Sequence, residues 1–268
     1  MTWSPQTYLL FEAERTRPVR ELLALAASET DGRGVVGRAV DVGCGPGNST
    51  EALIARFPNA AVEGLDSSPE MVEAARHRLP GIAFAQRDLR DWLSAPGEPC
   101  DVILSNAVLQ WVPNHWELFP AMAAALAPGG ILALQMPDNV DEPYHRLMRE
   151  TAGEGPWAER LAEARASRGR LLAPADYYVR LKPLFGRVTI WRTVYGLPMP
   201  SVDGIISWFS STALRPYLAA LDPPMKKAFL GAYRARLSEA YPPLADGTVF
   251  IEFPRRFLLG EGAHEDHA

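Results

Sequence analysis

A short glycine-rich segment constrains this chain more than any other feature. Residues 41–47 read Asp-Val-Gly-Cys-Gly-Pro-Gly, between an apolar run at 38–42 and a helical pattern at 49–57. Glycine allows a tight turn and lets the backbone approach a ligand with no side chain between them. Such a loop between a strand and a helix predicts an α/β fold that binds a small ligand there. The candidate ligand-binding residues are Asp41, Gly43, Cys44, Gly45 and Gly47.

The chemistry of this loop separates one class of cofactor from two others. Asn48 stands where the dinucleotide fingerprint requires its third glycine, and no Walker lysine follows the loop. The carboxylate of Asp41 would repel a pyrophosphate, whereas it would attract the ammonium group of a methionine moiety. The loop therefore favours S-adenosylmethionine over a nicotinamide dinucleotide or a nucleoside triphosphate.

Short apolar runs alternate with helical patterns from residue 38 to about residue 136. Strands are expected at 38–43, 61–65, 82–86, 100–105 and 131–136. This alternation predicts a doubly wound, mostly parallel sheet with helices on both faces. Two later strands, at 188–195 and 248–259, bring the sheet to seven, and helices are expected between them. Residues 152–173, rich in Gly, Arg and Ala, are expected to form a loop.

Further candidates follow the later strands, because ligands in such sheets bind at the carboxyl ends. Asp66 lies 19 residues after Gly47, near the spacing at which an acidic residue binds ribose hydroxyls. Ser67 stands beside it, although Ser67 and Ser68 also fit a helix N-cap. The remaining candidates are Asp88 and Leu89 for an adenine, Asn106 for the methionine half, and Trp111, which fits either a site or the core.

Composition narrows the class of partner and the compartment. The net charge of −5 provides no broad basic field, which argues against nucleic acid. No apolar run approaches the roughly 20 residues that span a bilayer, and residues 1–6 do not resemble a signal peptide. The two cysteines lack metal-ligand spacing, so we expect no metal site. A cytoplasmic location is expected, with no membrane partner, and a monomer is compatible with the sequence.

These residues support a resemblance to known proteins. The run from Asp41 to Gln135 resembles the class I, Rossmann-like S-adenosylmethionine-dependent methyltransferases, and nearly the whole chain resembles the trans-aconitate 2-methyltransferase family. The narrower resemblance rests on residues 3–9, 14–18, 41–50, 66–69, 106–113, 135–139, 214–218 and 253–255. The organisation implied is a helical lid (1–37), a cofactor-binding domain (38–200), a helical insertion over the active site (201–247), a final strand (248–260) and a disordered tail (261–268).

The resemblance implies methyl esterification of a carboxylate on a small polycarboxylic acid such as trans-aconitate, with S-adenosylhomocysteine as the other product. An acid with a pKa near about 4 is already ionised at neutral pH, so we expect no catalytic acid or base. Its other carboxylates favour bidentate arginine partners. Arg17, Arg215 and Arg255 lie in the resembling segments and are the candidates, together with Trp111. The family often has a histidine where this chain has Leu197. If that histidine helps to hold the substrate, its absence affects which acid this chain methylates.

Three other functions stay open at this point. The chain could methylate a different small carboxylate or a hydroxyl group. It could instead bind the cofactor as a non-catalytic partner protein. A hydride-transferring dehydrogenase is disfavoured by Asn48.

Overall fold

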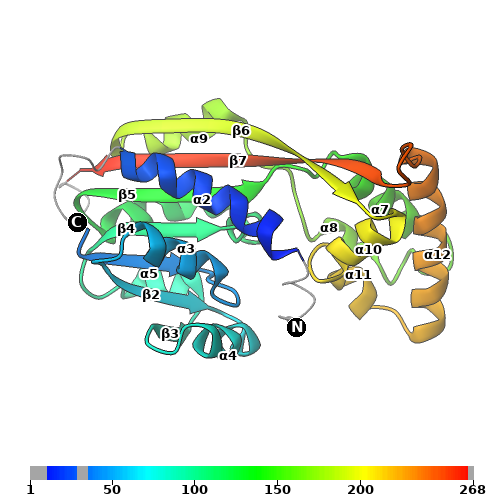
Figure 1. Ribbon diagram of the computed structural model, residues 1–268, viewed down its shortest axis with the longest axis horizontal. Helices are drawn as coiled ribbons and strands as arrows, with labels where there is room; N and C mark the ends of the chain where they lie inside the picture. The colour runs from blue at the N-terminus through cyan, green and yellow to red at the C-terminus, as the bar shows by residue number, and fades with distance from the viewer. Residues whose placement is uncertain (1–10, 29–35, 265–268) are drawn as a thin grey trace.

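The computed structural model in Figure 1 describes residues 11–28 and 36–264. Seven strands form one sheet in the order β3-β2-β1-β4-β5-β7-β6. Their bounds are β1 Arg38–Val42, β2 Ala61–Asp66, β3 Ala83–Gln86, β4 Cys100–Asn106, β5 Leu126–Pro137, β6 Phe185–Met199 and β7 Val249–Ala263. The strand β7 runs antiparallel to both β5 and β6, and the other neighbouring strands pair in parallel. The Rossmann-like, mostly parallel sheet expected from the sequence is confirmed.

Helices cover both faces of the sheet because side chains alternate along each strand. Val102 and Leu104 of β4 belong to the core beneath α2 (Glu12–Ser28) and α3 (Asn48–Arg56). Ile103, between them, belongs to the opposite core. That second core contains side chains of α5 (Leu89–Ser94), α6 (Phe119–Ala124) and α9 (Pro174–Leu181). The helix α4 (Pro69–Arg78) packs against β2 and β3 on the side of α2 and α3, where its Arg78 forms hydrogen bonds with Glu12 and Glu51.

A group of helices, the helical cap, lies beyond the carboxyl ends of the parallel strands (Figure 1). It consists of α7 Pro143–Gly153, α8 Ala162–Ala166, α10 Val202–Ser210, α11 Arg215–Ala219 and α12 Pro223–Ala240. The segment 152–173 differs from the loop expected there, because Trp157, Leu161 and Ala164 are buried in the main core. Their spacing of four and three residues is that of one helical face. The cap therefore has two parts, one before β6 and one after it.

The described segments near both ends of the chain pack more extensively than the sequence suggested. The apolar side chains of α2 (Val19, Leu22, Leu23 and Ala26) are almost completely buried, so this helix is part of the core. Residues 1–10 of the expected lid lie outside the described residues. The last strand continues past residue 260 to Ala263, with Glu261 opposite Ile131 and Arg187. The expected disordered tail is therefore strand up to Ala263, because pairing with β5 and β6 satisfies its backbone, and residues 265–268 lie outside the description.

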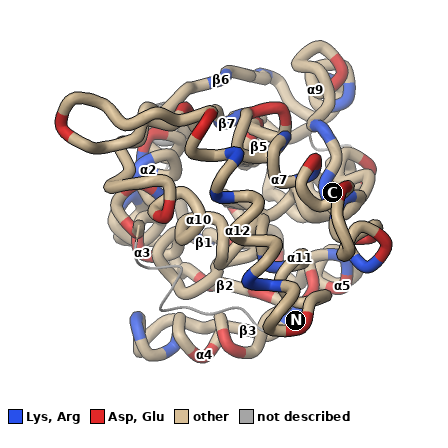
Figure 2. The backbone as a smooth tube through the Cα atoms, turned by 90° about the vertical axis from the view of Figure 1, so that its right-hand side faces the viewer, with Lys and Arg blue, Asp and Glu red and all other residues tan. Residues whose placement is uncertain are grey.

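The surface charge is mixed. In Figure 2, basic and acidic residues alternate over the side of the molecule that carries the helical cap. Within residues 11–28 and 36–264, no helix combines the length and the apolar character needed to cross a membrane.

Candidate active site

The glycine loop turns sharply between β1 and α3. Gly43 and Gly45 have φ values of +74° and +54°, in the left-handed region. A Cβ at Gly43 would lie 2.2 Å from Cγ2 of Val108, so no other residue fits there. A Cβ at Gly45 would meet no atom within 4 Å, because this position faces open space. The loop thus presents bare backbone to a cavity.

Asp66 at the end of β2 holds this loop in place. Its Oδ2 accepts a hydrogen bond from the Gly45 amide at 2.9 Å, and its Oδ1 accepts one from the Ser68 amide at 2.9 Å. Burial raises the pKa of Asp66, and these backbone hydrogen bonds oppose that effect. Ser68 is the N-cap of α4, accepting a hydrogen bond from the Met71 amide, which leaves Ser67 available to face the cavity.

A cavity of about 290 Å³, the loop cavity, lies where β1, β2 and β4 end. The sequence candidates on its wall are Gly43, Gly45, Asp66, Ser67, Asp88, Leu89, Asn106 and Trp111. Asp88 also caps α5, because its Oδ1 accepts a hydrogen bond from the Arg90 amide at 2.8 Å. The carboxyl ends of adjacent parallel strands meet at one edge of a sheet, so residues far apart in sequence gather here.

The other loop candidates, Asp41, Cys44 and Gly47, lie behind the cavity wall. The Oδ2 of Asp41 accepts hydrogen bonds from the hydroxyls of Ser49 and Thr50, each at 2.7 Å. Burial raises the pKa of Asp41 to about 6. Cys44 is buried against α4, and a Cβ at Gly47 would lie 3.4 Å from Ala75 of that helix. These three residues fix the loop against α3 and α4.

A second, smaller cavity of about 70 Å³, the arginine pocket, adjoins the loop cavity. Asn106, Ala107 and Trp111 line both of them. Arginines reach the arginine pocket from three separate parts of the chain: Arg15 of α2, Arg168 between α8 and α9, and Arg255 of β7. The rest of the wall is Gln110, Pro137, Asn139, Trp208, Phe209, Thr212, Ala213 and Phe253.

Two of these arginines are held by neutral groups and by aromatic rings. Arg15 donates through Nη2 to the Trp208 carbonyl at 3.0 Å, and its guanidinium lies over the Trp208 ring. Arg255 donates through Nη1 to Oε1 of Gln135 at 2.9 Å and lies over the ring of Phe253. Both side chains are largely excluded from solvent. A planar guanidinium fixed in this way can receive a carboxylate without further ordering.

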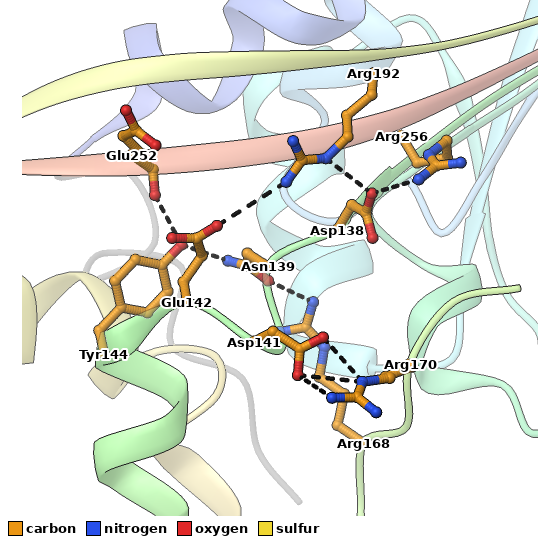
Figure 3. Close-up of polar contacts among 10 residues, drawn as sticks. All are labelled: Asp138, Asn139, Asp141, Glu142, Tyr144, Arg168, Arg170, Arg192, Glu252 and Arg256. Atoms are coloured by element: carbon orange, nitrogen blue, oxygen red, sulfur yellow. Dashed lines mark hydrogen bonds and ion pairs between the residues drawn. The ribbon is translucent and has the colours of Figure 1, made fainter. Parts of the chain in front are cut away.

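Arg168 is held by three acceptors, none of which is charged. Its Nη2 donates to the Pro137 carbonyl at 3.0 Å and to Oδ1 of Asn139 at 2.8 Å, and its Nη1 lies 3.1 Å from Nε2 of His145. Figure 3 shows Asn139 between Arg168 and Tyr144, whose hydroxyl donates to the Glu252 carbonyl at 3.1 Å. Burial lowers the pKa of Arg168 to about 10. No carboxylate among the described residues forms an ion pair with Arg168, so an anionic ligand would supply its counter-charge.

His145 must stay neutral to accept a hydrogen bond from Arg168, because a guanidinium can only donate. Burial lowers the pKa of His145 well below its ordinary value, so the unfolded chain binds more protons in mildly acidic solution. We therefore expect His145 to add to stability above about pH 6.5 and to lose that contribution as the pH falls. The free energy of unfolding of His145→Gln should depend less on pH, by up to about 1.4 kcal/mol per pH unit.

Urea unfolding of the cofactor-free protein between pH 5 and pH 7.5 measures this difference. Asp41, with its raised pKa, shifts stability in the opposite direction, so the comparison with wild type isolates the histidine. Equal slopes in the two proteins would contradict the assignment.

The other two arginine candidates do not line the arginine pocket. Arg17 is exposed, donates to Oε1 of Glu21 at 2.8 Å and lies over the ring of Tyr195. Arg215, at the start of α11, is partly buried and does not line the pocket. Leu197 of β6 packs against the core, so the departure from the family pattern does not alter this pocket wall.

Sequence reasoning missed Arg15 and Arg168. Arg15 could have been found, because it lies four residues before Val19 and seven before Leu22, on the buried face of α2. Arg17 lies on the opposite face of that helix. Arg168 carries no local signal, since all its hydrogen-bond partners lie at least 23 residues away.

Comparisons with known proteins agree with this geometry. A family model described as "Methyltransferase domain" matches residues 39–130. The chain is 51% identical to the trans-aconitate 2-methyltransferase of Methylobacterium nodulans over 260 residues, covering 96% of this chain and 97% of that protein. It is 48% identical to that of Rhodopseudomonas palustris strain BisB18, covering 96% and 98%. Among solved structures, the YcgJ protein of Bacillus subtilis has a TM-score of 0.56 at 15% identity, covering 91% of this chain and 99% of that one.

Proposed function

This chain belongs to the trans-aconitate 2-methyltransferase family of S-adenosylmethionine-dependent methyltransferases, and we propose that it methylates one carboxylate of trans-aconitate or of a closely similar polycarboxylic acid. The observation that carries this proposal is the arginine pocket. Its three guanidinium groups suit an acid that has further carboxylates besides the reacting one, in a protein whose own net charge is −5.

The loop cavity fits the cofactor. Gly43 and Gly45 leave room for a ligand against the backbone, and the carboxylate of Asp66 has lone pairs left for ribose hydroxyls. Asp88 and Leu89 line the same cavity and are the proposed contacts of the adenine. The Oδ1 of Asn106 is buried with no hydrogen-bond partner among the described residues, and the ammonium of a methionine moiety would satisfy it. Asp41, Cys44 and Gly47 would support the loop from behind.

The shared wall of the two cavities supports a direct transfer. When bound, S-adenosylmethionine supplies a methyl group on a positively charged sulfur, which an ionised carboxylate oxygen can attack without a general base. Arg15, Arg168 and Arg255 would hold the substrate's other carboxylates and turn the reacting one toward Asn106 and Trp111. The residues thus act by binding, by orientation and by excluding water. We assign no catalytic acid or base.

Incubation with radiolabelled cofactor and a panel of acids tests this function. We expect label in methyl esters of trans-aconitate and related tricarboxylates, with far less in dicarboxylates and none in monocarboxylates or alcohols. Methylation of an alcohol alone would favour the hydroxyl alternative. Cofactor binding with no transfer to any acceptor would favour a non-catalytic partner protein.

We also propose a cytoplasmic location, supported by two buried cysteines that form no disulfide.

Asp66→Ala should weaken cofactor binding by at least about tenfold, since each hydrogen bond to a charged group is worth about 1.5–3 kcal/mol. The structure adds a second reason, because Asp66 also anchors the Gly45 amide. Calorimetric titration of the folded variant measures the affinity. Asp91→Ala, an exposed acidic position on α5, is the control and should bind normally. Unchanged affinity in Asp66→Ala would remove this residue from the proposed site.

A further inference from the structure

Two further hollows extend the arginine pocket toward the surface between α7 and α8. The first shares Trp111, Arg168 and Ala213 with the arginine pocket and has a free volume of only about 20 Å³. Arg149 of α7 and Arg165 of α8 line this narrow hollow, and both also line an open groove of about 510 Å³ at the surface. The three hollows therefore adjoin one another in a row from the surface to the arginine pocket.

Positive charge along this row is not neutralised by neighbouring carboxylates. Within the described part of the chain, Arg149 and Arg165 form no ion pair, and Arg149 donates to the Val140 carbonyl at 2.7 Å. The acidic groups nearby already have partners. Glu150 lines the groove and lies 3.0 Å from Arg146, which lines it too, and Asp141 lies 2.7 Å from Arg170. The access row, defined as Arg149, Arg165 and Arg168, thus presents positive charge from the surface inward.

We propose that the access row guides a polycarboxylate from solvent into the arginine pocket, on the α7–α8 side. This inference rests on the proposed function, because it concerns the route of the same substrate. Clefts lined by one sign of charge raise the local concentration of an oppositely charged ligand and its association rate. The narrow hollow, at about 20 Å³, has room for little more than one water molecule and cannot pass a polycarboxylate, so the long side chains of Arg149 and Arg165 must swing aside. Such rotations take place within nanoseconds at a surface.

Stopped-flow binding of trans-aconitate to the protein loaded with S-adenosylhomocysteine tests the route, with tryptophan fluorescence as the signal. In the double variant Arg149→Gln/Arg165→Gln we expect an association rate constant roughly tenfold lower at low ionic strength, and a weaker dependence on salt. The dissociation rate, kcat and the affinity for the cofactor should change little, since neither residue lines the arginine pocket or the loop cavity.

Two comparisons control for net charge and for folding. Arg56→Gln/Arg180→Gln removes the same charge from α3 and α9, which lie away from α7 and α8 (Figure 1), and should associate at the wild-type rate. Arg149→Lys/Arg165→Lys keeps the charge and should also retain the rate. If the double glutamine variant does not fold, Arg165→Gln replaces it, because Arg165 is exposed.

An unchanged association rate in the glutamine variants would overturn the proposed role of the access row. An equal loss of rate in Arg56→Gln/Arg180→Gln would overturn it as well. So would a faster dissociation at an unchanged association rate, which would make these arginines part of the bound site. A wild-type protein that neither binds nor methylates any polycarboxylate would overturn the proposed function itself, and the access row with it.

Discussion

Arg168→Met is expected to lower kcat/KM for trans-aconitate by roughly 30-fold to several thousandfold. Removing one partner of a buried, hydrogen-bonded charge pair costs about 2–5 kcal/mol, and every 1.4 kcal/mol is tenfold. The cofactor affinity should stay close to that of wild type, because Arg168 does not line the loop cavity. The stability of the ligand-free protein should also change little. The variant loses the hydrogen bonds to Asn139 and Pro137, but it no longer buries a charge whose pKa is lowered to about 10.

Steady-state kinetics, cofactor titration and thermal unfolding of the same preparation separate these effects. Arg180→Met is the control, since Arg180 is exposed on α9 and lies outside the arginine pocket. Its kinetics should resemble wild type. A large loss of stability in Arg168→Met with normal kinetics in the folded fraction would show that Arg168 is a structural residue.

Gly45→Val is expected to reduce cofactor affinity by more than about a hundredfold while the protein still folds. A side chain at this position meets no protein atom within 4 Å, so the valine would fill the space left for the cofactor. The φ of +54° adds a strain of about 1–2 kcal/mol, which a folded domain of ordinary stability can bear.

Gly247→Val separates the strain from the blocked cavity. Gly247 has a φ of +83° and equally open surroundings, but it lies in the loop before β7, away from the loop cavity. Both variants should unfold at similarly lowered temperatures, and only Gly45→Val should fail to bind in calorimetric titration. Normal binding by Gly45→Val would contradict the assignment of this loop to the cofactor.

The cofactor side of the site could be predicted from the sequence because its determinants are local. The glycine loop needs particular backbone conformations, and Asp66 and Asp88 each stand at the end of a segment that the sequence predicts as a strand. Once the strands are parallel, their carboxyl ends meet at one edge, so these residues come together without knowledge of long-range packing. The sequence did not show, however, which of the candidate residues line the cavity. Asp41 faces Ser49 and Thr50 behind the loop.

The arginines of the substrate side differ in how far the sequence could assign them without the tertiary structure. The choice between Arg15 and Arg17 follows from the helical period, which places Arg15 on the apolar face with Val19 and Leu22. Arg255 was predicted from the resemblance, but its contact with Gln135, 120 residues away, appears only when β7 pairs with β5.

The sequence alone therefore determined the fold class, the cofactor loop and the acidic residues at the carboxyl ends of β2 and β3, since each depends on a short stretch of chain. Only the tertiary structure decided which arginines meet in the arginine pocket. Arg168 comes from a stretch expected to be a loop, and its position is set by Pro137, Asn139 and His145. Burial of Trp157 and Leu161 under the helical cap fixes the segment that carries it. The hydrophobic effect is non-directional, so the sequence does not show which apolar side chains will pack together. The position of the Arg168 guanidinium therefore follows only from the packed helical cap.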